Sequence, residues 1–104
     1  PNYYKDRMNT HNKKSLSIYV PCFSINTILK ALNVTKVDYF SLDVEGAELN
    51  IINSLDFNQF DIRTFTIEHN SYEHYKDEMI DFFKNNQSYN IVKIDTQDIY
   101  LIKK

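Results

Sequence analysis

The stretch VDYFSLDVEGAELNII, residues 37–52, decides the fold of this chain. Its first half is an almost continuous apolar run of strand length, which is typical of a strand buried on both faces of a parallel sheet. The run stops at Asp43, and Gly46 then offers the backbone freedom for a tight turn. Apolar residues recur every third position from Leu49, as on the buried face of a helix. The stretch therefore predicts a strand, a turn and a covering helix.

The same alternation of strands and helices extends in both directions along the chain. Upstream, LSIYV at residues 16–20 alternates as a strand does, and the next segment has helical spacing with Ser24 as its N-cap. Downstream, IRTFTIEHN at residues 62–70 predicts a strand, and an aromatic stripe from Tyr75 to Phe83 predicts a helix. The final runs YNIVKID and DIYLIKK flank a short polar turn. They predict an antiparallel hairpin.

This order of elements predicts an α/β fold with a mostly parallel sheet that ends in the antiparallel hairpin. Residues 1–15 are polar and without period, so we expect a loosely ordered arm there and one folded unit over residues 16–104. Cys22 is expected in the core. A chain of 104 residues that opens with Pro1 is short for a cofactor-binding enzyme, so a partner or further sequence is expected.

The charges and the single cysteine exclude several classes of protein. The chain has 12 basic and 14 acidic side chains and no dense basic segment, so nucleic acid is not expected as a partner. One cysteine rules out an internal disulfide and a cysteine-based zinc site.

No apolar run approaches the about 20 residues of a membrane span, and no signal peptide is recognisable. We expect a cytoplasmic protein without a membrane partner.

Two acidic residues, Asp43 and Glu68, end strands that we expect to be neighbours. Ligands of open α/β sheets bind outside the carboxyl ends of the strands, so these carboxylates predict a site at that edge. His69 and Asn70 follow Glu68, and this triplet could supply a base or bind a hard divalent cation. The pattern is also common in surface loops.

A purely structural interpretation of the same stretch is open. Asp43 or Glu45 would cap the following helix, and Glu48 in its first turn would complement the helix dipole.

The sequence lacks the glycine-rich loops that bind phosphates or cofactors in other proteins. Its single glycine allows no GxGxxG fingerprint and no Walker loop. A GxSxG elbow and an HExxH pair are absent as well.

The motifs DVEGAE at residues 43–48 and IEHN at residues 67–70 resemble the FkbM family of S-adenosylmethionine-dependent methyltransferases. The resemblance extends more loosely over residues 16–104. It implies a Rossmann-like methyltransferase three-layer sandwich, of which this chain would be the C-terminal half. The first half, which carries the glycine-rich turn for the cofactor, would lie elsewhere, so the resemblance implies a fragment.

The resemblance also implies a reaction and roles for individual residues. The family transfers a methyl group from S-adenosylmethionine to a hydroxyl, here of a small molecule or sugar. Asp43 would lie nearest the methyl donor and acceptor, and the catalytic residues Glu68 and His69 would orient or deprotonate the hydroxyl. Asp43, Glu45 and Gly46 would contribute to the cofactor site. By analogy with other oxygen methyltransferases, a divalent metal could bridge Asp43 and Glu68.

A function from another class is open: a noncatalytic α/β module. A half-sheet would leave the edge beside residues 37–43 unpaired, and unpaired strand edges recruit further strands. Through that edge the chain would pair with a partner protein or with a second copy as a homodimer.

Overall fold

The computed structural model describes residues 15–86 and 88–104, which form three helices and four strands. In chain order these are α2 (Ile25–Ala31), β1 (Lys36–Leu42), α3 (Glu48–Ser54), β2 (Asp61–Glu68), α4 (Glu73–Asn85), β3 (Tyr89–Ile94) and β4 (Asp98–Lys103). The order confirms the predicted alternation from α2 onward. The predicted arm over residues 1–15 lies outside the described residues, apart from Ser15.

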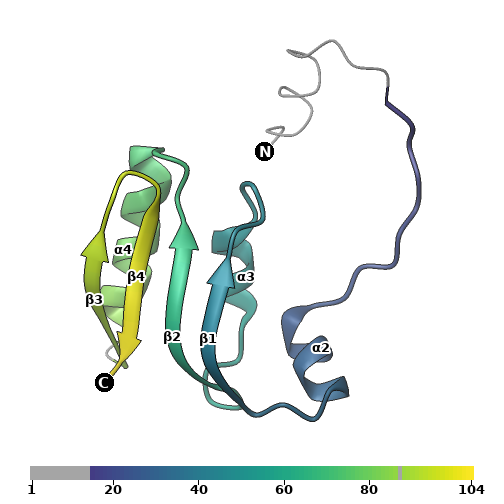
Figure 1. Ribbon diagram of the computed structural model, residues 1–104, viewed down its shortest axis with the longest axis horizontal. Coiled ribbons are helices and arrows are strands. Elements are labelled where there is room, and N and C mark those ends of the chain that lie inside the picture. The colour runs from purple at the N-terminus through teal and green to yellow at the C-terminus, as the bar shows by residue number, and fades with distance from the viewer. Residues whose placement is uncertain (1–14, 87) are drawn as a thin grey trace.

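The strands form a single sheet in the order β1-β2-β4-β3 (Figure 1). β1 and β2 run parallel, whereas β4 is antiparallel to both β2 and β3. The sheet is therefore mixed: its parallel part is confined to β1 and β2, and it ends in the predicted hairpin. α3 and α4 lie on one face of the sheet, and α2 lies beside β1 (Figure 1). This partial α/β sandwich places the carboxyl ends of β1 and β2 side by side at one edge.

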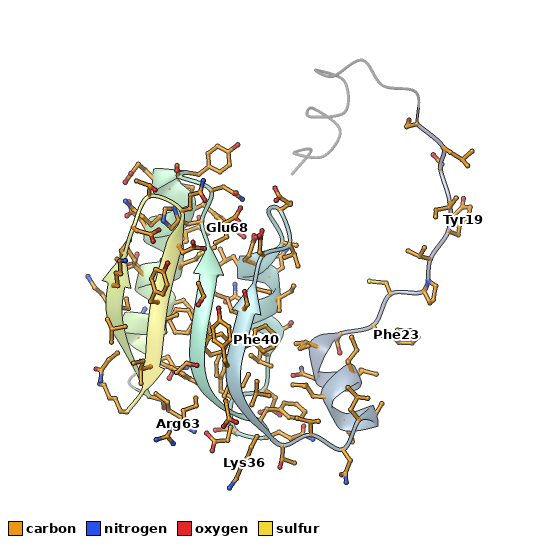
Figure 2. The ribbon with its side chains drawn as sticks, viewed as in Figure 1. Tyr19, Phe23, Lys36, Phe40, Arg63 and Glu68 are labelled. Atoms are coloured by element: carbon orange, nitrogen blue, oxygen red, sulfur yellow. The ribbon has the colours of Figure 1, made fainter. Side chains whose placement is uncertain are left out.

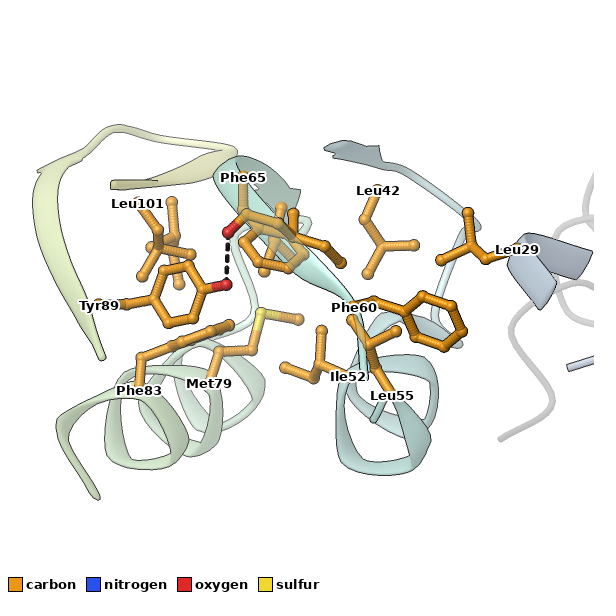
Figure 3. Close-up of a cluster of buried hydrophobic side chains, with 13 residues drawn as sticks. Leu29, Leu42, Ile52, Leu55, Phe60, Phe65, Met79, Phe83, Tyr89 and Leu101 are labelled. Carbon is orange, nitrogen blue, oxygen red and sulfur yellow. Dashed lines mark hydrogen bonds between the residues drawn. The ribbon is translucent and has the colours of Figure 1, made fainter. Parts of the chain in front are cut away.

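The core lies between the sheet and the helices α3 and α4 (Figure 3). Phe65 of β2 packs against Phe83 of α4 and Tyr89 of β3, with ring centroids 5.9 and 5.4 Å away. Tyr89 donates its hydroxyl to the carbonyl of Ile62, so its buried polar atom is satisfied (Figure 3). Burying a side chain of this size contributes about 1.5–3 kcal/mol. The cluster therefore holds α4 and the hairpin on β2.

The start of α2 follows the sequence prediction. The Ser24 side chain accepts a hydrogen bond from the Thr27 N–H at 3.2 Å. Asn33, with a φ of 56°, ends the helix in the left-handed region that asparagine tolerates. Of the apolar residues that give this segment its helical spacing, Leu29 is buried while Leu32 is exposed. α2 therefore covers the core with only a narrow part of its surface.

The predicted strand at residues 16–20 is wrong. Residues 15–24 have no regular secondary structure, and the side chains of residues 16–20 are exposed. An alternating pattern makes a strand only where a neighbouring strand completes its hydrogen bonds, and this segment pairs with no strand of the described sheet. Cys22 is exposed, so its predicted place in the core is also wrong. It belongs to the same segment, which does not pack on the core.

β1 is an edge strand and is not buried on both faces as its apolar run predicts. Among the described residues it pairs with β2 alone, and Tyr39 is 60% exposed. The Tyr39 hydroxyl still finds a partner in Thr66 of β2, at 2.9 Å. Within the described sheet, the unpaired edge expected for a noncatalytic module is therefore present. None of the described helices combines the length and the apolar character that crossing a membrane requires.

Candidate active site

The candidate site lies where β1 and β2 end. Leu42 and Ile67 form the last pair between these strands, so Asp43 and Glu68 come next at the same edge. Figure 2 shows Glu68 at the end of β2. One carboxylate oxygen each from Asp43, Glu45 and Glu68 lie within 4.8 Å of one another. The structure thus brings three of the predicted site residues together, and the expected metal at this edge stays a prediction.

The three carboxylates differ in their environments. Asp43 is exposed, whereas Glu45 and Glu68 are half-buried. Burial raises the pKa of Glu68 from 4.5 to about 7, and the hydrogen bond and negative charge of Asp43 act in the same direction, as do the charges of Glu45 and Glu48. A carboxyl group with a pKa near neutrality exchanges its proton readily at pH 7. Glu68 therefore has the proton affinity that acid–base chemistry requires.

β4 adds an acidic neighbour that the sequence analysis missed. Asp98 pairs with Glu68 in the antiparallel ladder between β2 and β4. Burial raises the pKa of Asp98, and the negative charges of Asp95 and Asp43 add to the effect. The register of the hairpin on β2 decides this proximity, and residue spacing along the chain does not reveal that register. The signal in the sequence that could have revealed this neighbour was the acidic residue at the start of the final strand.

The turn between β1 and α3 has an unusual backbone. Glu45 and Gly46 have φ angles of 56° and 113°, both in the region that favours glycine. The prediction that Gly46 permits a tight turn is confirmed. Ala47 is the N-cap of α3 and makes no side-chain cap hydrogen bond, so the interpretation of Asp43 or Glu45 as the cap is wrong.

Glu48 stabilises this turn, although its sequence position suggested only a dipole partner. Its side chain is buried, with 0% exposure. Its carboxylate accepts hydrogen bonds from the N–H groups of Val44 and Gly46 at 2.9 and 3.0 Å. The hydroxyl of Tyr75 donates a third bond at 3.0 Å. The last glutamate of the DVEGAE motif is therefore bonded to the loop that precedes it.

His69 makes different contacts from those expected of a residue facing the acidic cluster. It is 2% exposed. Its Nδ1 accepts a hydrogen bond from the Ser71 N–H at 3.1 Å, so Nε2 carries the proton and donates to the carbonyl of Asp95, also at 3.1 Å. The His69 backbone N–H bonds to the carbonyl of Gln97. Nε2 and the backbone N–H of His69 thus join the end of β2 to the turn between β3 and β4, while Nδ1 is bonded within the loop that follows β2.

The comparisons with known proteins point to one family. Residues 3–91 match a family model described as the methyltransferase FkbM domain. A search of curated proteins and a search of solved structures each gave no significant match. The matched residues include the carboxyl edge of β1 and β2 and the acidic cluster on it.

Proposed function

The chain belongs to the FkbM methyltransferase domain family, and we propose that it forms part of an S-adenosylmethionine-dependent O-methyltransferase. The acceptor would be a hydroxyl of a small molecule or sugar. The observation that carries the proposal is the cluster of Asp43, Glu45 and Glu68, because it lies inside the matched residues and at the edge where α/β sheets bind ligands. The free thiol of Cys22 is compatible with a cytoplasmic location.

The chemistry of the cluster fits one side of a cofactor site. S-adenosylmethionine supplies an electrophilic methyl group on a positively charged sulfonium, and it also carries an ammonium group. Carboxylates of Asp43 and Glu45 would complement these charges and accept hydrogen bonds from hydroxyl or amino groups. Gly46 would contribute through its backbone shape, since its N–H already bonds to Glu48.

The residues of this chain would mainly align the acceptor and take its proton. Glu68, with its pKa of about 7, would accept the proton of the acceptor hydroxyl. Asp43, adjacent and exposed, would orient that hydroxyl by a hydrogen bond. His69 would act indirectly, because both of its ring nitrogens are bonded within the protein. Residues 16–104 would form the C-terminal half of the methyltransferase domain, completed by a further half or by a second copy.

The test is calorimetric titration of the folded chain with S-adenosylmethionine and, in parallel, with S-adenosylhomocysteine, which lacks the sulfonium charge. We expect S-adenosylmethionine to bind more tightly and Asp43→Asn to reduce this preference several-fold, because the variant removes a negative charge beside the sulfonium. Asp38→Asn is the matched control, since Asp38 is an exposed aspartate within β1, the strand that Asp43 follows. An unchanged preference in Asp43→Asn would remove Asp43 from the cofactor site.

Methyl transfer is tested separately, with labelled cofactor and a panel of sugar and small-molecule alcohols. We expect Asp43→Asn to abolish transfer while circular dichroism shows an intact fold, because Asp43 is exposed and outside the core. If a folded chain binds neither ligand, the proposal that the cluster of this chain binds the cofactor without further residues fails.

The unpaired edge of β1 supports a second function, that of a noncatalytic module. The apolar groove between β1, α2 and α3, which includes Phe23, Ile28 and Phe40, flanks this edge on one face of the sheet. The exposed Tyr39 lies on the other face of β1, so an added strand could cover apolar surface on both faces. Sedimentation equilibrium distinguishes the two functions. A stable dimer that binds no cofactor would favour the module, whereas a monomer that binds cofactor would favour the enzyme.

A further inference from the structure

The buried carboxylate of Glu48 has no part in the proposed reaction, yet the fold accommodates it at 0% exposure. Burying a carboxylate costs several kcal/mol unless hydrogen bonds replace its lost hydration. Glu48 is compensated by three donors: the N–H groups of Val44 and Gly46 and the hydroxyl of Tyr75. Two of these donors belong to the loop that separates β1 from α3. The carboxylate therefore fixes this loop from the inside of the protein.

The two backbone donors lie on either side of Glu45. Glu45 has a φ of 56°, which is uncommon for a residue with a side chain, and Gly46 follows with a φ of 113°. A backbone of this kind persists only where its surroundings impose it. The bonds from Val44 and Gly46 to the two oxygens of Glu48 impose it here. They define where Glu45 and the preceding Asp43 lie.

Tyr75 connects this arrangement to a distant element, α4. Its hydroxyl accepts a hydrogen bond from the Leu49 N–H at 2.9 Å and donates to Glu48 Oε2 at 3.0 Å. Burial raises the pKa of Tyr75 to about 12, and the bond with Glu48 adds to the effect. The hydroxyl thus stays protonated as a donor at neutral pH. Through Tyr75, α4 thereby positions the Glu48 carboxylate, which in turn positions the loop between β1 and α3.

We propose that Glu48 and Tyr75 are positioning residues, which hold Asp43 and Glu45 against Glu68 through the backbone of residues 44–46. The consequence for catalysis rests on the function proposed above, but the positioning itself does not. Glu48 would act through the loop, and Tyr75 would act both through Glu48 and on the Gly46 carbonyl, which lies 3.2 Å from its hydroxyl. The role differs from simple stabilisation because it predicts a local change at the acidic cluster in variants that remain folded.

The experiment compares Glu48→Gln with Glu73→Gln, and Tyr75→Phe with Tyr19→Phe, in the whole chain. Both Glu48 and Glu73 lie in the first turn of a helix, but the Glu73 side chain is 79% exposed. Tyr19 is fully exposed. The amide group that replaces the carboxylate in Glu48→Gln can accept through one oxygen only, and its NH2 group opposes the second backbone donor.

We expect hydrogen exchange at the Val44 and Gly46 amides to accelerate at least about tenfold in Glu48→Gln, since charge-assisted bonds are lost. Exchange in the centre of β2 should change much less. The titration of Glu68, followed by NMR of its carboxyl carbon, should shift towards the ordinary value as Asp43 and Glu45 move away. Tyr75→Phe should produce the same changes at smaller amplitude, because it removes one donor of the three. Both control variants should match the wild type.

Unchanged exchange at Val44 and Gly46 and an unchanged titration of Glu68 in a folded Glu48→Gln protein would overturn the positioning role. If Glu48→Gln does not fold, the milder Tyr75→Phe decides by the same readouts. Exchange that rises evenly over the whole chain would also overturn it, since that result indicates a loss of global stability alone. None of these measurements needs a bound cofactor. Their failure is therefore distinguishable from a failure of the proposed function, which the titration with S-adenosylmethionine tests.

Discussion

Replacing Asp43 with Asn tests whether the carboxylates at the sheet edge interact as the structure indicates. The pKa of Glu68 is raised from 4.5 to about 7 by its burial first, and then by the hydrogen bond and charge of Asp43. Asp43→Asn leaves the burial in place, removes the charge and offers an amide donor that favours the ionised form of Glu68. We expect the pKa of Glu68 to fall by about one unit, which corresponds to about 1.4 kcal/mol.

The raised pKa also predicts how stability depends on pH. Between the ordinary pKa of 4.5 and the folded value of about 7, the folded protein binds more protons at Glu68 than the unfolded chain does. The free energy of unfolding therefore falls as the pH rises through this window. The full difference would amount to about 3.4 kcal/mol, but solvent screening at the exposed Asp43 carboxylate reduces our expectation to about 1–2 kcal/mol. In Asp43→Asn, the free energy of unfolding should decrease less over the same pH window.

Two measurements check this prediction. Carbon NMR of the carboxyl groups gives the pKa of Glu68 directly, and urea unfolding at several values between about pH 5 and pH 8 gives the free energy of unfolding. Asp38→Asn serves as control, because it removes one exposed charge from β1, the strand that Asp43 follows. A wild-type Glu68 that titrates near 4.5, its ordinary pKa, would refute the reasoning. So would a pKa that is the same in Asp43→Asn and in the wild type.

Two further predictions concern the core and the hairpin turn. Phe65→Ala should lower the free energy of unfolding by about 3–5 kcal/mol, because it leaves a cavity in the aromatic cluster. Val92 is exposed, so Val92→Ala should lower it by less than about 1 kcal/mol. Equal losses in urea unfolding would contradict this prediction. The N–H groups of Gln97 and Asp98 lower the pKa of Asp95 to about 2, so Asp95 contributes stability that is lost as the pH falls below 3.8, its ordinary pKa, towards that value. The Asp95→Asn variant should therefore lose less stability than the wild type over this acidic range, as followed by circular dichroism. Acid-unfolding curves of the two proteins that run parallel would rule out a lowered pKa of Asp95.

The sequence predicted those parts of the fold that local patterns determine. The apolar run before Asp43 and the β-branched run before Glu68 identified β1 and β2, and helical spacing identified the three helices. The proximity of Asp43 and Glu68 followed from one topological rule: consecutive strands joined by a helix tend to lie side by side and parallel. The predicted family agrees with the family match over residues 3–91.

Other features depend on contacts that no local pattern contains. Residues 16–20 have the alternation of a strand, but a strand also needs a paired neighbour, and these residues pair with no strand of the described sheet. Glu48 resembled any acidic residue in a first helical turn, and only the left-handed backbone at Glu45 and Gly46 brings two N–H groups onto its carboxylate. His69 and Asp98 obtained their surroundings from the register of the hairpin on β2.

The arrangement at the sheet edge explains how the fold tolerates several carboxylates in a small space. Like charges this close repel each other, and the protein reduces the repulsion in two ways. Glu48 is compensated by fixed donors inside the protein, while Glu68 is near its own pKa at neutral pH and can hold a proton in place of a counter-charge. A cation arriving beside Asp43 would favour the ionised form of Glu68 and so release its proton. The cluster would then offer a proton acceptor when a positively charged ligand occupies the edge, which the methyl transfer proposed above would use.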